Sequence, residues 1–300
     1  MSSSVFLETP KDLFFTKNDP EDQRFGDFMS ESSANIFLLG YPDDEGIRMN
    51  AGREGAALAP DQIRKYFYKM TPNPFVAKHP LFKDLGNLNP QLSLQVKHEQ
   101  SQAKCQEVLA QNKLLITLGG GHDYGYPDAA AFLNANPQGV VINFDAHLDV
   151  RPTNQGHHSG TPFRRLLEKF PRTPFFEVGI LPFCNSPHHF EWAIKQGTTV
   201  CTPNELIKNL GKFQGRPLWI SLDMDVFSSA IAPGCSQSWA TGMQYPEFDS
   251  CLEKICQLLD CKGLGIYEVS PPYDHDGMTS KLAASIMHRW IYLNMKDSHR

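Results

Sequence analysis

The sequence predicts an α/β protein in which a parallel β-sheet forms the middle of three layers and helices cover both of its faces. Three observations lead to this prediction. Short apolar segments alternate with longer segments of helical period along most of the chain. Most of the apolar segments lack polar alternation, as expected of strands that are buried on both faces. Several of the helical segments begin with Pro or with a capping Ser or Thr.

Strands and helices are expected in alternation along the chain. The expected strands are Ile36–Leu39, Leu114–Leu118, Val140–Phe144, Phe175–Val178, Leu218–Leu222 and Leu264–Val269. The expected helices are Pro60–Met70, Gln100–Gln111, Pro162–Phe170, Pro187–Gln196, Thr202–Leu210, Pro246–Leu259 and Ser280–Leu293. Because no repeat, low-complexity tract or long linker divides the chain, residues 1–300 are expected to form a single domain. About the first 30 residues are the candidate for a flexible arm.

Composition and charge exclude several classes of protein. The chain has 28 basic and 33 acidic residues, a net charge of −5, which argues against a general nucleic-acid binder. Its N-terminus lacks the pattern of a secretory signal, and no apolar segment approaches the ~20 residues that span a bilayer. Its seven cysteines include no C-x-x-C pair, so free thiols are favoured over disulfides or a structural zinc site. We therefore expect a cytoplasmic protein without membrane or nucleic-acid partners.

Three polar clusters follow three of the expected strands. They are Gly119-Gly120-Gly121-His122-Asp123, Asp145-Ala146-His147-Leu148-Asp149 and Asp223-Met224-Asp225. Because open α/β sheets place their ligand sites at the carboxyl ends of the strands, we expect the three clusters to meet at one edge of the sheet.

These clusters have the composition of a site for two metal ions. In the middle cluster the ionisable residues alternate, so all three side chains would leave one face if the strand continued through them. Burying such groups together is costly unless a cation neutralises them. Four carboxylates and two imidazoles exceed what one metal ion uses, whereas two ions that share carboxylates can use them all. Mixed Asp and His ligation suits Mn²⁺ better than metals that prefer thiolates.

Each cluster also has a simpler interpretation. An isolated Asp-x-Asp at a strand end is often only a cap or a surface pair, and a glycine triplet can be a tight turn. It can also be a phosphate loop, but no Lys-Ser or Lys-Thr follows it. The order of the three clusters, each after a buried strand, favours the metal site. The remaining histidines that we considered are expected to be surface or core groups: His79, His98, His188, His189, His275 and His288.

The same motifs resemble those of the ureohydrolases, the arginase and agmatinase superfamily. The similarity extends from about Ile36 to Pro271 and includes the three clusters, Ala232-Pro233-Gly234 and the upstream segment Asn50-Ala51-Gly52-Arg53-Glu54-Gly55-Ala56. It implies a three-layer arginase-like fold, a centre with two Mn²⁺ per chain and a homo-oligomer. The first ion would be held by His122, Asp145, Asp149 and Asp223. The second would be held by Asp145, His147, Asp223 and Asp225, so that Asp145 and Asp223 bridge the two ions.

Within that superfamily the chain most resembles the formimidoylglutamase branch, which converts N-formimino-L-glutamate and water to L-glutamate and formamide. The matching segments are Asp22-Gln23-Arg24-Phe25-Gly26-Asp27, Asp145–Pro152 and Ser159-Gly160-Thr161-Pro162-Phe163-Arg164. Arginases have Asn where this chain has Arg151, and a proton-shuttling His that we align with Phe163. Arg is the natural partner of a carboxylate, so an anionic amidine is the expected substrate. An ion pair between Arg151 and an acidic neighbour in the loop is the alternative.

The resemblance also assigns roles to individual residues. Glu268 matches the glutamate that anchors amidine or guanidine nitrogens, although a structural strand-end carboxylate is the alternative. Arg151 and Ser159 are expected to bind substrate together with Glu268. Asp149 would transfer a proton from the attacking water to the departing amine.

Three other functions remain open. The first is another amidine hydrolase of the same family: agmatinase, arginase or a guanidino-acid hydrolase. The second is a single-zinc deacetylase, in which His122 and the second carboxylate of Asp223 and Asp225 would be surplus ligands. The third is a non-catalytic binding protein that retains the fold.

Overall fold

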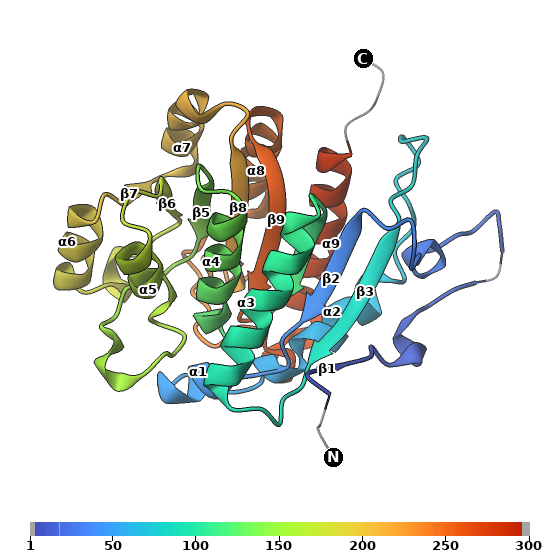
Figure 1. Cartoon of the computed structure of the whole chain (residues 1–300), viewed down its shortest axis with the longest axis horizontal. Helices are drawn as coiled ribbons and strands as arrows, with labels where there is room; N and C mark the ends of the chain where they lie inside the picture. The colour runs from blue at the N-terminus through green and yellow to red at the C-terminus, as the bar shows by residue number, and fades with distance from the viewer. Residues whose placement is uncertain (1–3, 18, 296–300) are drawn as a thin grey trace.

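In the computed structural model, which describes residues 4–17 and 19–295, nine strands form one sheet (Figure 1). The strands are β1 (Phe6–Leu7), β2 (Ile36–Gly40), β3 (Phe82–Leu88), β4 (Leu114–Leu118), β5 (Val140–Phe144), β6 (Phe175–Val178), β7 (Thr199–Cys201), β8 (Pro217–Asp223) and β9 (Asp260–Tyr267). Their order across the sheet is β1-β3-β2-β4-β9-β8-β5-β6-β7. Neighbouring strands are parallel except for β1 and β3. The predicted parallel α/β sheet is therefore confirmed.

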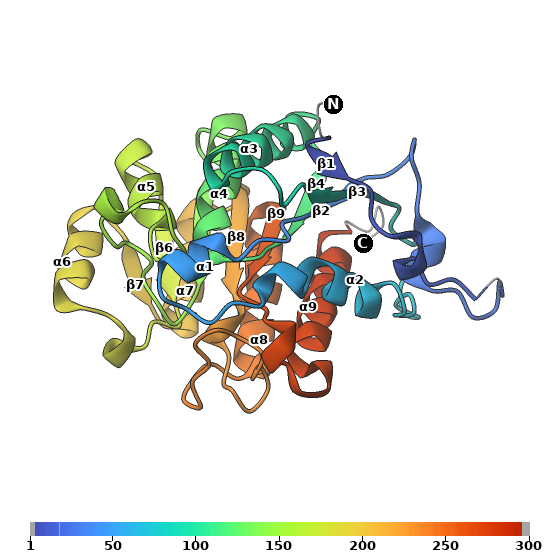
Figure 2. The ribbon, with the colours of Figure 1, turned by 90° about the horizontal axis from the view of Figure 1, so that it is seen from below.

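Helices cover both faces of this sheet (Figure 2). They are α1 (Glu45–Met49), α2 (Ala59–Phe67), α3 (Leu94–Ala110), α4 (Gly125–Ala135), α5 (Pro162–Lys169), α6 (Pro187–Lys195), α7 (Pro203–Leu210), α8 (Tyr245–Leu258) and α9 (Met278–Asn294). Apolar residues of α2, α7, α8 and α9 form one core with one face of the sheet, and those of α3, α4, α5 and α6 form a second core with the other face. Within the described residues, no helix has the length and apolar character that crossing a bilayer requires.

Six of the seven predicted helices begin within two residues of the predicted position, whereas α3 begins at Leu94, six residues before the predicted Gln100. Local capping accounts for the starts of α6 and α7. At α7 the Thr202 side chain accepts a hydrogen bond from the Glu205 backbone N–H, and the Glu205 carboxylate accepts one from the Thr202 N–H at 2.8 Å. This capping box satisfies two donors that a helix start otherwise leaves unpaired. At α6 the Ser186 side chain accepts a hydrogen bond from the His189 backbone N–H, without the reciprocal bond, and Pro187 and Pro203 occupy the first helical positions.

Several elements were not predicted. Strand β3 contains Lys83, Asp84, Gly86 and Asn87, a composition that reads as a loop; its pairing with β2 and β1 overrides that weak propensity. Helix α4 begins without a side-chain cap and is short, apolar and Ala-rich, so it lacks a polar face from which a helical period can be recognised. Strands β1 and β7, which have two and three residues, are too short to show a period, as is α1.

The N-terminal segment contacts the rest of the molecule. Strand β1 pairs with β3, while Phe25 and Phe28 belong to the core beside α2. Residues 1–3 and 18 of the expected arm lie outside the described residues. The flexible arm and the single domain both stay predictions, because contacts within one structure test neither.

Candidate metal centre and cavity

The turn after β4 brings His122 to the edge of the sheet. Gly120 is required in this turn, since a Cβ there would lie 1.8 Å from the carbonyl oxygen of Asp43. The His122 ring stacks on Tyr267 with centroids 4.8 Å apart, and its Nε2 hydrogen-bonds to Ser221 Oγ at 2.8 Å. These contacts fix the ring so that Nδ1 faces the carboxylates of the other two clusters.

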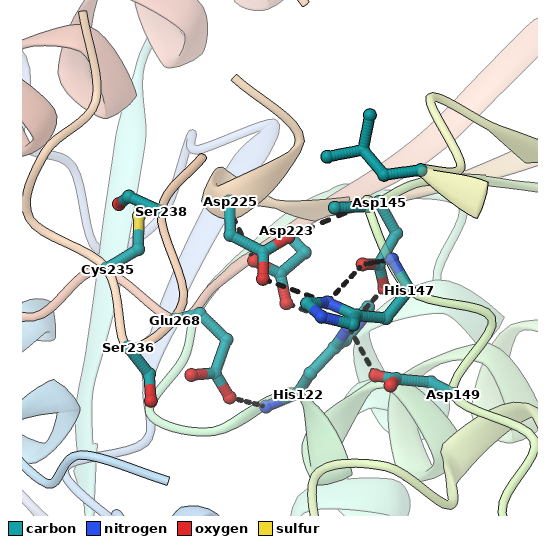
Figure 3. Close-up of polar contacts among 12 residues, drawn as sticks. His122, Asp145, His147, Asp149, Asp223, Asp225, Cys235, Ser236, Ser238 and Glu268 are labelled. Atoms are coloured by element: carbon teal, nitrogen blue, oxygen red, sulfur yellow. Dashed lines mark hydrogen bonds and ion pairs between the residues drawn. The ribbon is translucent and has the colours of Figure 1, made fainter. Parts of the chain in front are cut away.

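His122 Nδ1 lies among three carboxylate oxygens (Figure 3). It is 3.0 Å from Asp145 Oδ2, 3.1 Å from Asp149 Oδ2 and 3.2 Å from Asp223 Oδ2. Although it is buried, this nitrogen makes no hydrogen bond of acceptable geometry. A buried nitrogen that is surrounded by carboxylates but unpaired has the environment of a metal ligand.

The middle cluster converges through a loop rather than through a strand. Strand β5 ends at Phe144, as predicted, so the strand does not continue through Asp145–Asp149 and strand alternation is not what directs these side chains. The loop turns at once, because the His147 backbone N–H donates to Asp145 Oδ1 at 2.6 Å. Asp149 has a φ of 47°, a left-handed conformation that is uncommon for any residue but Gly. The turn and this left-handed residue together direct all three side chains to one place.

The third cluster begins at the end of β8. Asp223 is the last residue of the strand, and its Oδ1 accepts a hydrogen bond from the Asp225 backbone N–H at 2.8 Å. Asp225 Oδ2 in turn lies 3.0 Å from His147 Nδ1. The six residues expected to bind metal are therefore brought together by the ends of three strands.

Among the described residues these six side chains form two groups with the spacing of metal ligands. The first group is His122, Asp145, Asp149 and Asp223; the second is Asp145, His147 and Asp225. Asp145 is common to both, as expected of a bridging ligand. Asp223 belongs only to the first group, so its role as a second bridge stays a prediction.

The buried carboxylates carry an excess of negative charge. Burial, followed by repulsion from Asp145, raises the pKa of Asp149 to about 6. Burial, followed by repulsion from Asp225, raises the pKa of Asp223 well above its usual range. Among residues 4–17 and 19–295, these groups form ion pairs with His122 and His147. Bound divalent cations would relieve this repulsion, so the donor set fits metal ions.

Glu268 lies beside the metal centre, at the end of β9. The predicted strand included this residue, but β9 ends at Tyr267 and Glu268 adopts a left-handed conformation with a φ of 64°. Its Oε1 accepts a hydrogen bond from the His122 backbone N–H at 3.0 Å. Burial raises its pKa to about 8, and the charge of Asp225 adds to this effect. Figure 3 shows the Glu268 carboxylate facing the ligand cluster.

A cavity of about 690 Å³ leads to the centre. Its wall includes the predicted substrate-binding residues Arg151, Ser159 and Glu268. Arg151 Nη1 donates to Asn50 Oδ1 at 2.8 Å, and Asn50 Nδ2 donates to Ser159 Oγ at 3.0 Å. The alternative that we considered for Arg151 was an ion pair with an acidic neighbour. Within the part of the chain that the structure describes, its partner is instead the neutral amide of Asn50.

Comparison with known proteins agrees with this geometry. The model of the arginase family matches residues 34–292. The chain belongs to the arginase family. A formimidoylglutamase of Legionella pneumophila (strain Lens) is 31% identical over 299 residues, covering 92% of this chain and 90% of the relative. The solved structure of Trypanosoma cruzi formiminoglutamase with Mn²⁺ matches with a TM-score of 0.83 and 27% identity, covering 91% of this chain and 98% of that one. Formimidoylglutamase of Bacillus subtilis gives a TM-score of 0.83 and 25% identity, covering 95% of each chain.

One alignment with arginases needs correction in this arginase-family protein. We aligned Phe163 with the His that shuttles protons, but Phe163 is fully buried on α5 and packs against the His122 and Phe175 rings. It does not line the cavity, so a His at this position could not exchange protons with solvent. The cavity residue in that segment is Ser159.

Sequence reasoning missed three groups of the site. Asn50 stands in the upstream segment that suggested the family, but no role was assigned to it. Asn143 and Glu177 are fully buried behind Asp145, where burial and the charge of Asp145 raise the pKa of Glu177 well above its usual range. Asn143 and Glu177 could have been found as isolated polar residues in otherwise apolar strands.

Proposed function

We propose that this protein uses two Mn²⁺ ions to hydrolyse N-formimino-L-glutamate to L-glutamate and formamide. The observation that carries the proposal is the junction of two ligand groups at Asp145 beside a cavity whose wall holds Arg151. The formimidoylglutamases among its relatives support it, as does the solved Trypanosoma cruzi formiminoglutamase with Mn²⁺.

The six ligand residues would divide between two ions. His122, Asp145, Asp149 and Asp223 would hold one, and Asp145, His147, Asp223 and Asp225 the other, so that Asp145 and Asp223 would be shared by the two ions. When bound, the two ions would supply a water molecule of lowered pKa and an electrophile for the developing negative charge.

The protein's own residues then position the substrate and move the proton. The Glu268 carboxylate accepts hydrogen bonds from the amidine nitrogens and holds the formimino carbon above the metal centre. Arg151, on the wall of the same cavity, binds a carboxylate of the glutamate moiety, and Ser159 donates or accepts a hydrogen bond there. Asp149, as a ligand beside the attacking water, accepts its proton and delivers it to the departing amine nitrogen. Cleavage of the C–N bond releases formamide and L-glutamate.

Two further properties belong to the same proposal. The seven cysteines are free thiols, which supports an enzyme that works in the reducing cytoplasm. The family resemblance supports a homo-oligomer, which light scattering of the purified protein would test.

Turnover by Mn²⁺-loaded protein tests the proposal. Formiminoglutamate, arginine, agmatine and 4-guanidinobutanoate are compared at equal concentration, and the release of each product is measured. We expect the largest kcat/KM with formiminoglutamate. A larger value with agmatine, which has no carboxylate, would refute the assigned substrate but not the amidine-hydrolase chemistry. Absence of any turnover with metal bound would favour a binding protein.

A further inference from the structure

A row of small and polar residues crosses the sheet just before the strand ends that carry the metal ligands. The strand registers pair Thr117 with Gly265, Gly265 with Ser221, Ser221 with Asn143, and Asn143 with Glu177. The row therefore spans the five adjacent strands β4, β9, β8, β5 and β6 on the face covered by α4 and α5. Ser221 and Asn143 each stand two residues before a ligand, Asp223 and Asp145 respectively.

Asn143 connects two carboxyl groups within this row. Its Nδ2 donates to Asp145 Oδ2 at 3.2 Å and to Glu177 Oε2 at 2.8 Å. All three residues are fully buried. Because the Asp145 carboxylate can only accept, the nitrogen of the Asn143 amide must face it. Rotation of the amide by half a turn would place its oxygen against Asp145. Glu177 Oε2, which accepts a hydrogen bond from the same nitrogen, holds the amide in the orientation that Asp145 requires.

The orientation of Asp145 matters more than that of any other ligand. Its Oδ2 lies 3.0 Å from His122 Nδ1 in the first ligand group, and its Oδ1 receives the His147 N–H beside the second. A carboxylate shared by the two ligand groups would serve both ions, so a small rotation of Asp145 would weaken both sites at once. Hydrogen-bond partners behind a ligand are what set such rotations.

We propose that Asn143 and Glu177 are positioning residues, which act in series to hold the Asp145 carboxylate in the orientation that binds both metal ions. This inference rests on the proposed metal centre but not on the proposed substrate.

A purely structural role accounts for the pair less well. Glu177 Oε1 and Asn143 Oδ1 are buried and have no hydrogen-bond partner among the residues that the structure describes. Leaving such atoms unpaired is unfavourable, and apolar residues would fill these strand positions without that loss, as Phe175 and Val141 do on the same face. The hydrogen bonds that the two side chains do make lead from Glu177 through Asn143 to Asp145.

Mn²⁺ binding to chelator-treated protein tests this proposal directly. The dissociation constants are measured by titration calorimetry, and unbound Mn²⁺ is counted by its electron paramagnetic resonance signal. We expect Asn143→Leu to weaken Mn²⁺ binding about 10–100-fold, the usual effect of removing a group behind a ligand. Glu177→Leu should weaken it about tenfold, whereas Glu177→Gln, which keeps an acceptor oxygen, should stay within about threefold of wild type.

The double variant Asn143→Leu/Glu177→Leu distinguishes action in series from independent effects. If Glu177 acts through Asn143, the double variant binds Mn²⁺ no more weakly than Asn143→Leu alone. Effects that multiply would overturn the proposal. Should Asn143→Leu not fold, the contrast between Glu177→Leu and Glu177→Gln decides, and equal losses in those two variants would overturn it.

Val141→Ala is the matched control for a loss of packing. Val141 lies on β5, on the same face as Asn143 and two residues before it, and is fully buried. The Val141→Ala variant should have a lower midpoint of thermal unfolding and an unchanged Mn²⁺ affinity. An affinity loss equal to that of Asn143→Leu would mean that Asn143 and Glu177 act through packing. Wild-type protein that binds Mn²⁺ but leaves formiminoglutamate intact would refute the proposed substrate only. Wild-type protein that binds no Mn²⁺ would refute both proposals.

Discussion

Replacement of Arg151 by Ala removes the positive charge that we assign to the substrate carboxylate. Arg151 is exposed at the cavity wall, and its side chain is held by Asn50 at 2.8 Å. A hydrogen bond between charged groups is worth about 1.5–3 kcal/mol. Since solvent reaches the exposed guanidinium and screens it, we take about 1.5–2.5 kcal/mol, which corresponds to a loss of about 10- to 70-fold in kcat/KM.

Steady-state kinetics with formiminoglutamate measure this loss. Arg151→Lys should recover part of the activity, because an ammonium retains the charge but not the planar pair of donors. Arg164→Ala is the control, since Arg164 lies on the nearby helix α5 but pairs with Glu168 and does not line the cavity. Mn²⁺ content and thermal unfolding should be unchanged in all three variants. If Arg151→Ala retains wild-type kcat/KM, or if Arg164→Ala loses as much, the carboxylate assignment is wrong.

Three further predictions concern the metal ions, the amidine anchor and the core. Elemental analysis should find two Mn²⁺ per reloaded chain and at least one fewer after His147→Ala; full activity with a single ion in the wild type would exclude the two-metal centre. Glu268→Gln should lower kcat/KM strongly while both ions remain bound, and unchanged kinetics would assign Glu268 to structure. Asp84→Asn removes the buried counter-charge of Arg64, whose Nε lies 2.8 Å from Asp84 Oδ2, and leaves this arginine with the half-exposed Asp61 at 3.6 Å. Urea unfolding should therefore show a loss of about 3–5 kcal/mol. Burial alone would raise the pKa of Asp84, but the charge of Arg64 outweighs it and lowers that pKa below the ordinary 3.8. This stabilisation is therefore present at neutral pH and should disappear as the pH falls through the lowered pKa, and a wild-type stability that is constant down to pH 3 would contradict it.

The fold was predictable where strands are buried on both faces. Segments such as Val140–Phe144 and Phe175–Val178 match β5 and β6 residue for residue, because a short, continuous apolar run between chain breakers is typical of a strand with both faces covered. Strand β3 was not predictable in this way. Its polar residues are compensated by distant partners, such as the Arg64 guanidinium that pairs with Asp84, and such partners are invisible to a local pattern.

The sequence predicted which residues form the site better than it predicted how the backbone arranges them. All six expected ligands come together, since the order of the clusters after strands determines which residues meet. The backbone path between Asp145 and Asp149 was not accessible, because it depends on a left-handed residue that no composition rule predicts for Asp. Likewise Asn50 became visible only when the fold brought two loops more than 100 residues apart in the sequence into contact, as its bond to Ser159 shows.

The left-handed backbone at Asp149 and Glu268 lowers the stability of the fold at two residues to which we assign a role in the reaction. Non-glycine residues in such conformations carry about 1–3 kcal/mol of strain each, and both side chains add a buried carboxylate to an already negative site. In the metal-free protein, glycine at either position would relieve the backbone strain and remove a repelling charge. Screens for heat-resistant variants in the absence of Mn²⁺ should therefore repeatedly select replacements at these two positions, and each gain would remove a group that we assign to the reaction. Directed evolution of this fold needs selection for turnover beside selection for stability, or it will select inactive proteins.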